Sequence, residues 1–450
     1  MPGPRADGRA GREGGPLASS ALLLLASQVA GNTGYFVAVL LLARALEPAG
    51  RGEVAFITVT AMVVARTVNL GLNEATRVFV AQRPAQRATL LTNLVLAVIG
   101  LSIGGALIVC GALAALPGVR PPSIGTRQLV IVLLATLATA LVYAGYSYLQ
   151  GCSRFRPYGL VQSTGSWLYA VLLATIWVGP GLTATRAASA WVVSQAIPAI
   201  VLLGACERGI GIGAPNLALL RESVGFGMRA WGGGLSHFLN ARTDQILTAL
   251  IASEATLGIY AVAVNASEVL FYLPSAVAAA LLPSIARETG GHAAERTLRV
   301  FRAVALVTAA ATIVAAVLGP LVIPLVFGDA YRQSVGPFLW LLPSALGFAA
   351  SVTFSTALVA SNAPGMSSLG PTVSLISGIA LDLVLIPAYG ASGAAAAASA
   401  ALLAGGFIAA IAYRNRAGFA WGALVPRAQD VRALRLLARR ELRWRAAPAS

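Results

Sequence analysis

The sequence predicts an all-α polytopic membrane protein with about twelve transmembrane helices in two halves. The 450 residues are 57% hydrophobic and only 11% charged, too little charge to cover a soluble protein of this length. Apolar runs of about 20 residues, the length that crosses a bilayer, recur along the whole chain. The connections between them are short, and none is long enough for a soluble catalytic domain.

The expected spans are apolar runs separated by polar or arginine-containing segments. They lie at residues 17–42, 54–73, 89–115, 129–150, 159–179, 187–205, 224–250, 257–283, 300–326, 336–360, 367–387 and 391–413. The first run follows Arg5, Arg9 and Arg12 and is too long for the apolar region of a signal peptide. It is therefore interpreted as a retained first span.

Arginine placement predicts the orientation. All 32 basic residues are arginine and the net charge is +16, but the arginines are spread along the chain rather than grouped on one soluble domain. With the N-terminus inside, most of them fall in inner segments, as the positive-inside rule requires. We therefore expect a multi-pass protein of the bacterial cytoplasmic membrane with both termini in the cytoplasm, and no nucleic-acid partner.

The longest polar interruption in mid-chain, "ERGIGIGAPNLALLRESVGFG", divides the spans into two sets of six. The predicted organisation is an N-terminal tail (1–16), an N-lobe (17–205), a cytoplasmic linker (206–223), a C-lobe (224–413) and a cytoplasmic tail (414–450). "GRGEVAFITV" in the first half resembles "TLGIYAVAV" in the second. Duplicated halves with a substrate site between them are a common transporter design.

The basic tail from Arg427 to Arg445 has the spacing of an amphipathic helix, with Val431, Leu434 and Leu442 on one side. One interpretation is a helix on the anionic inner leaflet. The other is a solvated tail that only reflects the positive-inside bias.

No enzyme motif is present: the chain lacks a P-loop, a metal-ligand cluster and a nucleophile elbow. The spacing of Cys110, Cys152 and Cys206 fits neither a metal site nor a disulfide framework. We therefore expect no cofactor and no catalytic residues.

Four stretches resemble bacterial polysaccharide repeat-unit flippases of the multidrug/oligosaccharidyl-lipid/polysaccharide exporter superfamily. They are "LLARALEPAGRGEVAFITVTAMVVARTVNLGLNEATRVFVAQ", "RTDQILTALIASEATLGIYAVAVNASEVLFYLPSAVAAALLPSIAR", "FGDAYRQSVGPFLWLLP" and "LDLVLIPAYGASGAAAAASA". These matches are collinear over roughly residues 17–413. The resemblance implies two six-helix lobes around a central cavity and export of an isoprenoid-diphosphate-linked oligosaccharide. Peptidoglycan-precursor flippases of the superfamily usually have fourteen spans.

Arg66 lies within the second expected span, toward its inner end, with Asn69 nearby. A charge in mid-span costs about 2.5–3.5 kcal/mol on insertion scales, so it normally faces a polar cavity or a partner. Arginine suits a diphosphate because its planar fork forms paired, charge-assisted hydrogen bonds. The alternative is an arginine that reaches the interface or pairs with an acid on another helix.

The seventh expected span carries the richest polar pattern. His237, Asn240 and Asp244 share one face of a continuous helix, which predicts a cavity lining. Arg242 and Asp244 are two residues apart and face nearly opposite sides, so they do not form a local pair. Hydrogen bonding between helices is the alternative role for this stripe.

Glu268 lies in the middle of the eighth span, where it can neutralise Arg242 across the short hairpin or take part in ion coupling; pairing is the favoured interpretation. Asp382, near the outer end of the eleventh span, is expected to have an interfacial or capping role. Glu74, at the inner end of the second span, is expected at the interface too.

These observations predict a flippase that moves a lipid-diphosphate-linked oligosaccharide by alternating access, for cell-surface polysaccharide biosynthesis. Its predicted cavity residues are Arg66, Asn69, His237, Asn240, Arg242, Asp244 and Glu268. The expected partners are this substrate, membrane lipids and glycan-assembly enzymes. The alternatives are a drug or small-cation exporter of the same superfamily, a membrane-embedded glycosyltransferase or polymerase, and a scaffold in glycan assembly.

Overall fold

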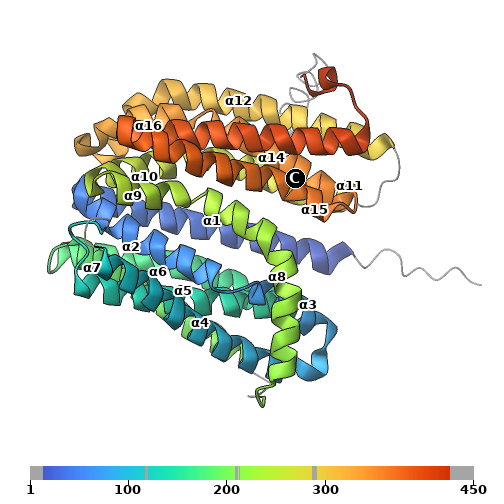
Figure 1. Cartoon of the computed structure of the whole chain (residues 1–450), viewed down its shortest axis with the longest axis horizontal. Helices are drawn as coiled ribbons and strands as arrows, with labels where there is room; N and C mark the ends of the chain where they lie inside the picture. The colour runs from blue at the N-terminus through green and yellow to red at the C-terminus, as the bar shows by residue number, and fades with distance from the viewer. Residues whose placement is uncertain (1–13, 117–119, 208–210, 212, 286–290, 426–450) are drawn as a thin grey trace, which may run out of the picture. The chain divides into compact units, whose positions relative to one another are not determined.

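The computed structural model describes residues 14–116, 120–207, 211, 213–285 and 291–425, which form helices joined by short connections (Figure 1). The chain forms two compact units. Unit 1 comprises Met1–Leu46 and Ile57–Trp231, and unit 2 comprises Glu47–Phe56 and Gly232–Ser450. The predicted tail helix at 427–445 lies outside the described residues, and the predicted lobe boundaries stay predictions.

Membrane-length helices dominate both units. Among the described residues, eight helices are long and apolar enough to cross a bilayer, and the count is ten if two bent helix pairs are each one span. The multi-pass membrane class expected from the sequence is therefore confirmed. The longest helix, α16 (Leu369–Ala417), contains a non-helical residue, Gly390, with φ 56° and ψ −130°. It thus joins the expected eleventh and twelfth spans.

The described part of unit 1 is built from six whole helices and parts of α2 and α8. They are α1 (Gly14–Ala45), the later part of α2 (Pro48–Thr67), α3 (Leu72–Gln82), α4 (Arg87–Ala115), α5 (Thr126–Gly151), α6 (Phe155–Val178), α7 (Ala184–Glu207) and α8 (Leu217–Asn240). α6 packs on α1 and α7, and α5 packs on α3, α4 and α7. Leu72, Phe79, Leu94, Tyr148 and Leu202 are buried in its core.

Unit 2 contains the remaining helices. They are α9 (Thr243–Ile251), α10 (Glu254–Glu268), α11 (Tyr272–Ile285), α12 (Gly291–Phe327), α13 (Val335–Leu341), α14 (Ser344–Ala360), the short α15 (Pro364–Ser367) and α16. α16 packs on α9, α13 and α14. Four 3₁₀ turns complete the described chain: η1 (Pro84–Gln86) in unit 1, and η2 (Val269–Phe271), η3 (Asp329–Ser334) and η4 (Trp421–Leu424) in unit 2.

Glycine lets helices of unit 2 approach closely. A Cβ at Gly52 in the first turns of α2 would overlap the carbonyl oxygen of Glu254, and one at Gly258 in α10 would overlap that of Pro48. Such small residues permit backbone contact between membrane helices. The two stretches whose sequences resemble each other, around Gly52 and Gly258, therefore lie against one another.

Four expected spans are interrupted. The second breaks after Thr67 and continues as α3, bent by 52°. The seventh breaks between Asn240 and Thr243, the eighth breaks at η2, just before Pro274, and the tenth bends by 46° between Leu341 and Ser344. One continuous helix was expected through His237, Asn240 and Asp244 of the seventh span, and this was wrong. Three of these four breaks lie near a charged residue inside the run: Arg66, Arg242 and Glu268.

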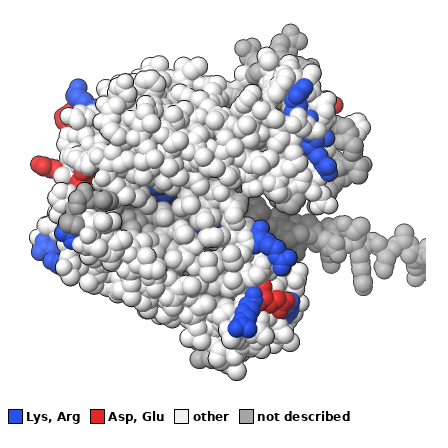
Figure 2. Space-filling model, viewed as in Figure 1, with Lys and Arg blue, Asp and Glu red and all other residues white. Residues whose placement is uncertain are grey.

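The described surface of each unit is largely uncharged. In Figure 2, the arginine and acidic side chains of each unit gather near helix ends, and the middle of each unit's visible face is nearly free of them. This distribution is typical of helices surrounded by lipid, where charge is confined to the interfaces.

Candidate functional site

The break between α2 and α3 is a tight turn in unit 1. Leu70 and Gly71 have left-handed backbones, with φ of 50° and 75°. A Cβ at Gly71 would lie 2.3 Å from the backbone of Gly227 in α8, so only glycine fits. The Oδ1 atom of Asn69 accepts a hydrogen bond of 2.9 Å from the Asn73 N–H. The predicted cavity residue Asn69 thus supports the turn from a buried position.

Arg66 lies beside this turn in a three-membered charge cluster. Its Nη2 is 3.4 Å from Oε1 of Glu74, and Nη2 of Arg77 is 3.0 Å from the same oxygen. Two guanidinium groups therefore share one carboxylate, which leaves a surplus positive charge. The Arg66 guanidinium also lies 5.7 Å from the ring centroid of Tyr143, within the usual range of a cation–π contact. Glu74 thus holds two arginines together, and its expected position at the interface stays a prediction.

The break between α8 and α9 positions Arg242 in unit 2. Arg242 has a non-helical backbone, with φ −139° and ψ −20°. Its Nη1 donates a hydrogen bond of 2.8 Å to Oε1 of Glu268, the last residue of α10. The predicted ion pair between Arg242 and Glu268 is therefore confirmed.

The continuous polar stripe expected on the seventh span is not present, because the helix breaks within it. His237 and Asn240 end α8, while Asp244 begins α9. The His237 ring lies 6.0 Å from that of Phe348, and Asn240 Oδ1 accepts a hydrogen bond of 3.0 Å from Ser374 of α16. His237 and Asn240 therefore contact different helices of unit 2 and do not form one polar face with Asp244.

Asp244 is buried, and both of its carboxylate oxygens have donors. Oδ1 accepts from the Gln245 N–H at 2.7 Å, and Oδ2 accepts from the Tyr260 hydroxyl of α10. Buried carboxylates of this kind require such donors, because an unpartnered charge in hydrocarbon is expensive.

Asp382 is the polar residue whose position sequence analysis missed. It was expected at the interface, but its side chain is only 3% exposed inside α16. α16, which carries Asp382, packs on α9, which carries Asp244. Oδ1 of Asp382 makes no hydrogen bond within the described part of the chain. The sequence indication was there: Asp382 is the single charged residue in a long apolar run.

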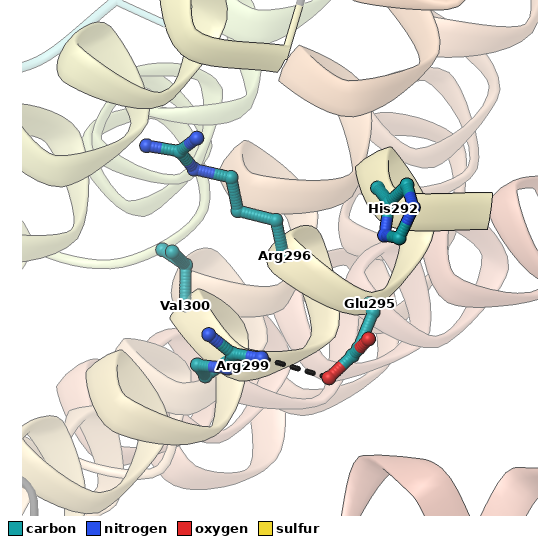
Figure 3. Close-up of a pocket in the computed structure, with 5 residues that line it drawn as sticks. All are labelled: His292, Glu295, Arg296, Arg299 and Val300. Atoms are coloured by element: carbon teal, nitrogen blue, oxygen red, sulfur yellow. Dashed lines mark hydrogen bonds and ion pairs between the residues drawn. The ribbon is translucent and has the colours of Figure 1, made fainter. Parts of the chain in front are cut away.

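A second charged region lies at the start of α12. Figure 3 shows an open pocket lined by His292, Glu295, Arg296, Arg299 and Val300, of about 590 Å³. Nη2 of Arg299 donates to Oε1 of Glu295 at 2.7 Å. Both side chains are well exposed, so the pair adds little stability. This pocket belongs to the polar surface of unit 2.

The predicted site residues are thus divided between the units. Arg66 and Asn69 lie in unit 1, and His237, Asn240, Arg242, Asp244 and Glu268 lie in unit 2. Within unit 2 the structure pairs Arg242 with Glu268 and packs α9, which carries Asp244, on α16, which carries Asp382. The shared cavity stays a prediction.

Residues 41–336 match a family described as "Polysaccharide biosynthesis protein". Because this match covers more than half of the sequence, the chain belongs to that family. A comparison with curated proteins finds no match.

Solved structures share the fold. The Lipid II flippase MurJ in an inward closed conformation has a TM-score of 0.71 at 12% identity, over 89% of this chain and 88% of that chain. An inward-facing multidrug resistance MATE family transporter of the MOP superfamily has a TM-score of 0.67 at 12% identity, over 86% and 94%. An outward-facing MATE transporter has a TM-score of 0.58 at 13% identity, over 89% and 94%. The predicted superfamily fold is confirmed.

Proposed function

We propose that this member of the polysaccharide biosynthesis protein family flips an isoprenoid-diphosphate-linked oligosaccharide from the inner to the outer leaflet of the bacterial cytoplasmic membrane. Transport proceeds by alternating access between an N-lobe (17–205) and a C-lobe (224–413), with both termini in the cytoplasm. The family description supports a role in polysaccharide biosynthesis. The fold likeness to a lipid II flippase supports a lipid-linked substrate.

The observation that carries this proposal is the pair of guanidinium groups that share Glu74. A diphosphate cannot cross hydrocarbon without replacements for its hydrogen bonds to water. Arg66 and Arg77 carry one more positive charge than Glu74 neutralises, and their planar forks suit phosphate oxygens. In this proposal the diphosphate takes the place of Glu74 at one guanidinium, while Asn69 keeps the turn in shape.

The pair in unit 2 has a related role. Arg242 is held by Glu268, so it is available to an anion only when that hydrogen bond opens. Exchange of Glu268 for a diphosphate at Arg242 would pass the substrate onward without leaving an unpaired charge in the membrane. His237 and Asn240 border this path and interact with the glycan.

Uptake of a monovalent cation, either a proton or Na⁺, drives transport in this proposal. Asp244 and Asp382 are two buried carboxyls on packed helices. An ionised carboxylate buried in a membrane is poorly solvated, so a bound cation relieves this penalty. Oδ1 of Asp382 has no hydrogen-bond partner among the described residues, which supports an uptake point at this position.

The test is flipping in proteoliposomes that contain only this protein. A fluorescent undecaprenyl-diphosphate-linked oligosaccharide would be placed in one leaflet, and a membrane-impermeant glycosidase would report sugar on the other. Protein-dependent exposure of the sugar supports the proposal, and exposure equal to that in protein-free vesicles contradicts it. Arg332→Ala provides a matched control, because Arg332 lies in an exposed pair with Asp329.

A drug or small-cation exporter is the second candidate, because multidrug transporters share the fold. The same vesicles distinguish the two functions. Gradient-driven uptake of a cationic dye without sugar flipping would favour the exporter.

A further inference from the structure

Unit 1 has an apolar groove between α6 and α7 that the proposed transport does not use. Its volume is about 350 Å³, and its walls are Thr164, Gly165, Trp167 and Val171 of α6 and Ile197, Pro198 and Val201 of α7, with Val161 and Leu168. Trp167, Val171, Ile197 and Val201 are all exposed. The groove is therefore open to the hydrocarbon that surrounds the helices.

The polar groups beside the groove already have partners. The Thr164 hydroxyl donates to the Leu160 carbonyl at 2.7 Å, and the Trp167 indole N–H donates to the Ala30 carbonyl of α1 at 3.1 Å. An occupant gains no hydrogen bond from these groups. The groove therefore suits a hydrocarbon chain rather than a polar molecule.

The floor of the groove is formed by a glycine of α6 and a proline of α7. Pro198 interrupts the hydrogen bonding of α7, and a Cβ at Gly165 would lie 3.3 Å from its Cγ. The absence of a side chain at Gly165 therefore keeps the space open at this point. The Trp167 ring is fixed by its bond to α1, so this wall is formed before any ligand arrives.

A positive charge lies at the start of the same helix. Arg156 is exposed in the first turn of α6, and Val161 begins the groove five residues later, about 8 Å along the helix at 1.5 Å per residue. The groove then runs to Val171, a further ~15 Å. A phosphate at Arg156 is thus within reach of an acyl chain that lies in the groove. The arginine distribution predicts that α6 begins at the inner surface, where anionic lipids are abundant.

We propose that the α6–α7 groove binds one acyl chain of an anionic phospholipid whose phosphate contacts Arg156. The bound lipid fills the space between α6 and α7 and supports unit 1. This lipid site is separate from the Arg66 cluster and does not depend on the transported substrate.

The test is lipid retention by the full-length protein, measured by native mass spectrometry after mild delipidation with phosphatidylglycerol or phosphatidylcholine present. Val171→Trp and Ile197→Trp would fill the groove from its exposed walls. Val193→Trp, exposed on α7 but not lining the groove, is the matched control. We expect both groove variants to lose one retained phosphatidylglycerol and the control to keep it.

Arg156→Gln tests the contact to the lipid headgroup separately from binding of the acyl chain. We expect its preference for phosphatidylglycerol over phosphatidylcholine to fall about fivefold, the equivalent of one basic residue near an anionic surface. Equal retention by wild type and both groove variants, with all proteins monodisperse and of equal Tm, would overturn the proposal. Displacement of phosphatidylglycerol by undecaprenyl phosphate at equal concentration would also overturn it, and would assign the groove to an isoprenoid tail.

Discussion

The two units both place an arginine at a break in a membrane helix, but they form the breaks by different means. In unit 1 the turn before α3 requires Gly71, whose φ is 75°. In unit 2 the break at Arg242 has φ −139° and contains no glycine; Arg242 there bonds to Glu268 and Asp244 to Tyr260. A local residue thus determines the first break, and hydrogen bonds between helices stabilise the second.

The charge balance of the two breaks also differs. The side chains of Arg66 and Glu74 are 25% and 18% exposed, and those of Arg242 and Glu268 are 21% and 25% exposed. The two ion pairs are therefore buried to a similar extent, and burial does not account for their different charge balance. Unit 1 adds a second arginine, Arg77, whereas unit 2 adds two buried acids. The comparison suggests anion binding in unit 1 and cation uptake in unit 2.

The largest expected effect tests the glycine-dependent break. Gly71→Ala should destabilise the protein by about 3 kcal/mol or more, because the new Cβ meets the Gly227 backbone and the φ is unfavourable for alanine. Gly104→Ala is the control, since nothing lies within 4 Å of a Cβ there. It should leave the Tm unchanged or raise it. Equal Tm values for the two variants would show that the turn tolerates a side chain.

The second prediction concerns the buried acids of unit 2. Asp244→Asn combined with Asp382→Asn should abolish the dependence of flipping on an ion gradient. One charge moved across about 100 mV supplies about 2.3 kcal/mol, equivalent to about a 50-fold distribution ratio. With a gradient imposed, the ratio of labelled lipid between the two leaflets should be lower by about this factor in the double variant than in the wild type. An unchanged gradient dependence would remove the cation role from unit 2.

The third prediction tests the tertiary support of the second break. Glu268→Ala should lower stability by about 2 kcal/mol, because it leaves Arg242 partly buried without this acceptor. Thermal unfolding in detergent measures the change as a lower Tm. The exchange Arg242→Glu with Glu268→Arg should recover part of the loss. A double variant no more stable than Glu268→Ala would indicate that the pair itself contributes little.

The fourth prediction addresses the arginine surplus of unit 1. Arg66→Ala should reduce the initial flipping rate about tenfold, the equivalent of one charge-assisted hydrogen bond of about 1.5 kcal/mol. Arg66→Lys should retain more activity than Arg66→Ala, because it keeps the charge. Wild-type rates in Arg66→Ala, with Arg332→Ala for comparison, would argue against a diphosphate contact at this position.

The smallest effect is a pH dependence within unit 1. Nη1 and Nη2 of Arg83 both donate hydrogen bonds to the carboxylate of Glu222 in α8, and both residues lie outside the predicted spans. This hydrogen bonding lowers the pKa of Glu222 below its ordinary range. The pair's contribution to stability is therefore present above about pH 4.3, the ordinary pKa of a glutamate, and is lost as the pH falls through the lower folded-state pKa.

Glu222→Gln should remove the contribution of the Arg83–Glu222 pair to stability. The difference in Tm between wild type and Glu222→Gln should be small near neutral pH, since solvent screens a pair whose Arg83 and Glu222 side chains are 32% and 50% exposed, and should vanish in acid. A difference that grew as the pH fell would contradict the direction of the pKa shift.

Particular residues show how far sequence reasoning reached. The pairing of Arg242 with Glu268 was predictable, because two opposite charges on neighbouring spans of a short hairpin have few other ways to avoid hydrocarbon. The break at Arg242 was not predictable, since the residues around it have ordinary helical propensity. The burial of Asp382 was missed because α16 packs on α9 and α14, segments far apart from Asp382 in the sequence.

The sequence by itself determined the membrane class, the approximate spans and the family resemblance, because bilayer thickness imposes a run length that can be counted along the chain. Tertiary structure decided where the spans break, which arginines share Glu74, and that a groove remains between α6 and α7. These features depend on which side chains meet across helices, and such partners are set by packing in three dimensions rather than by local composition.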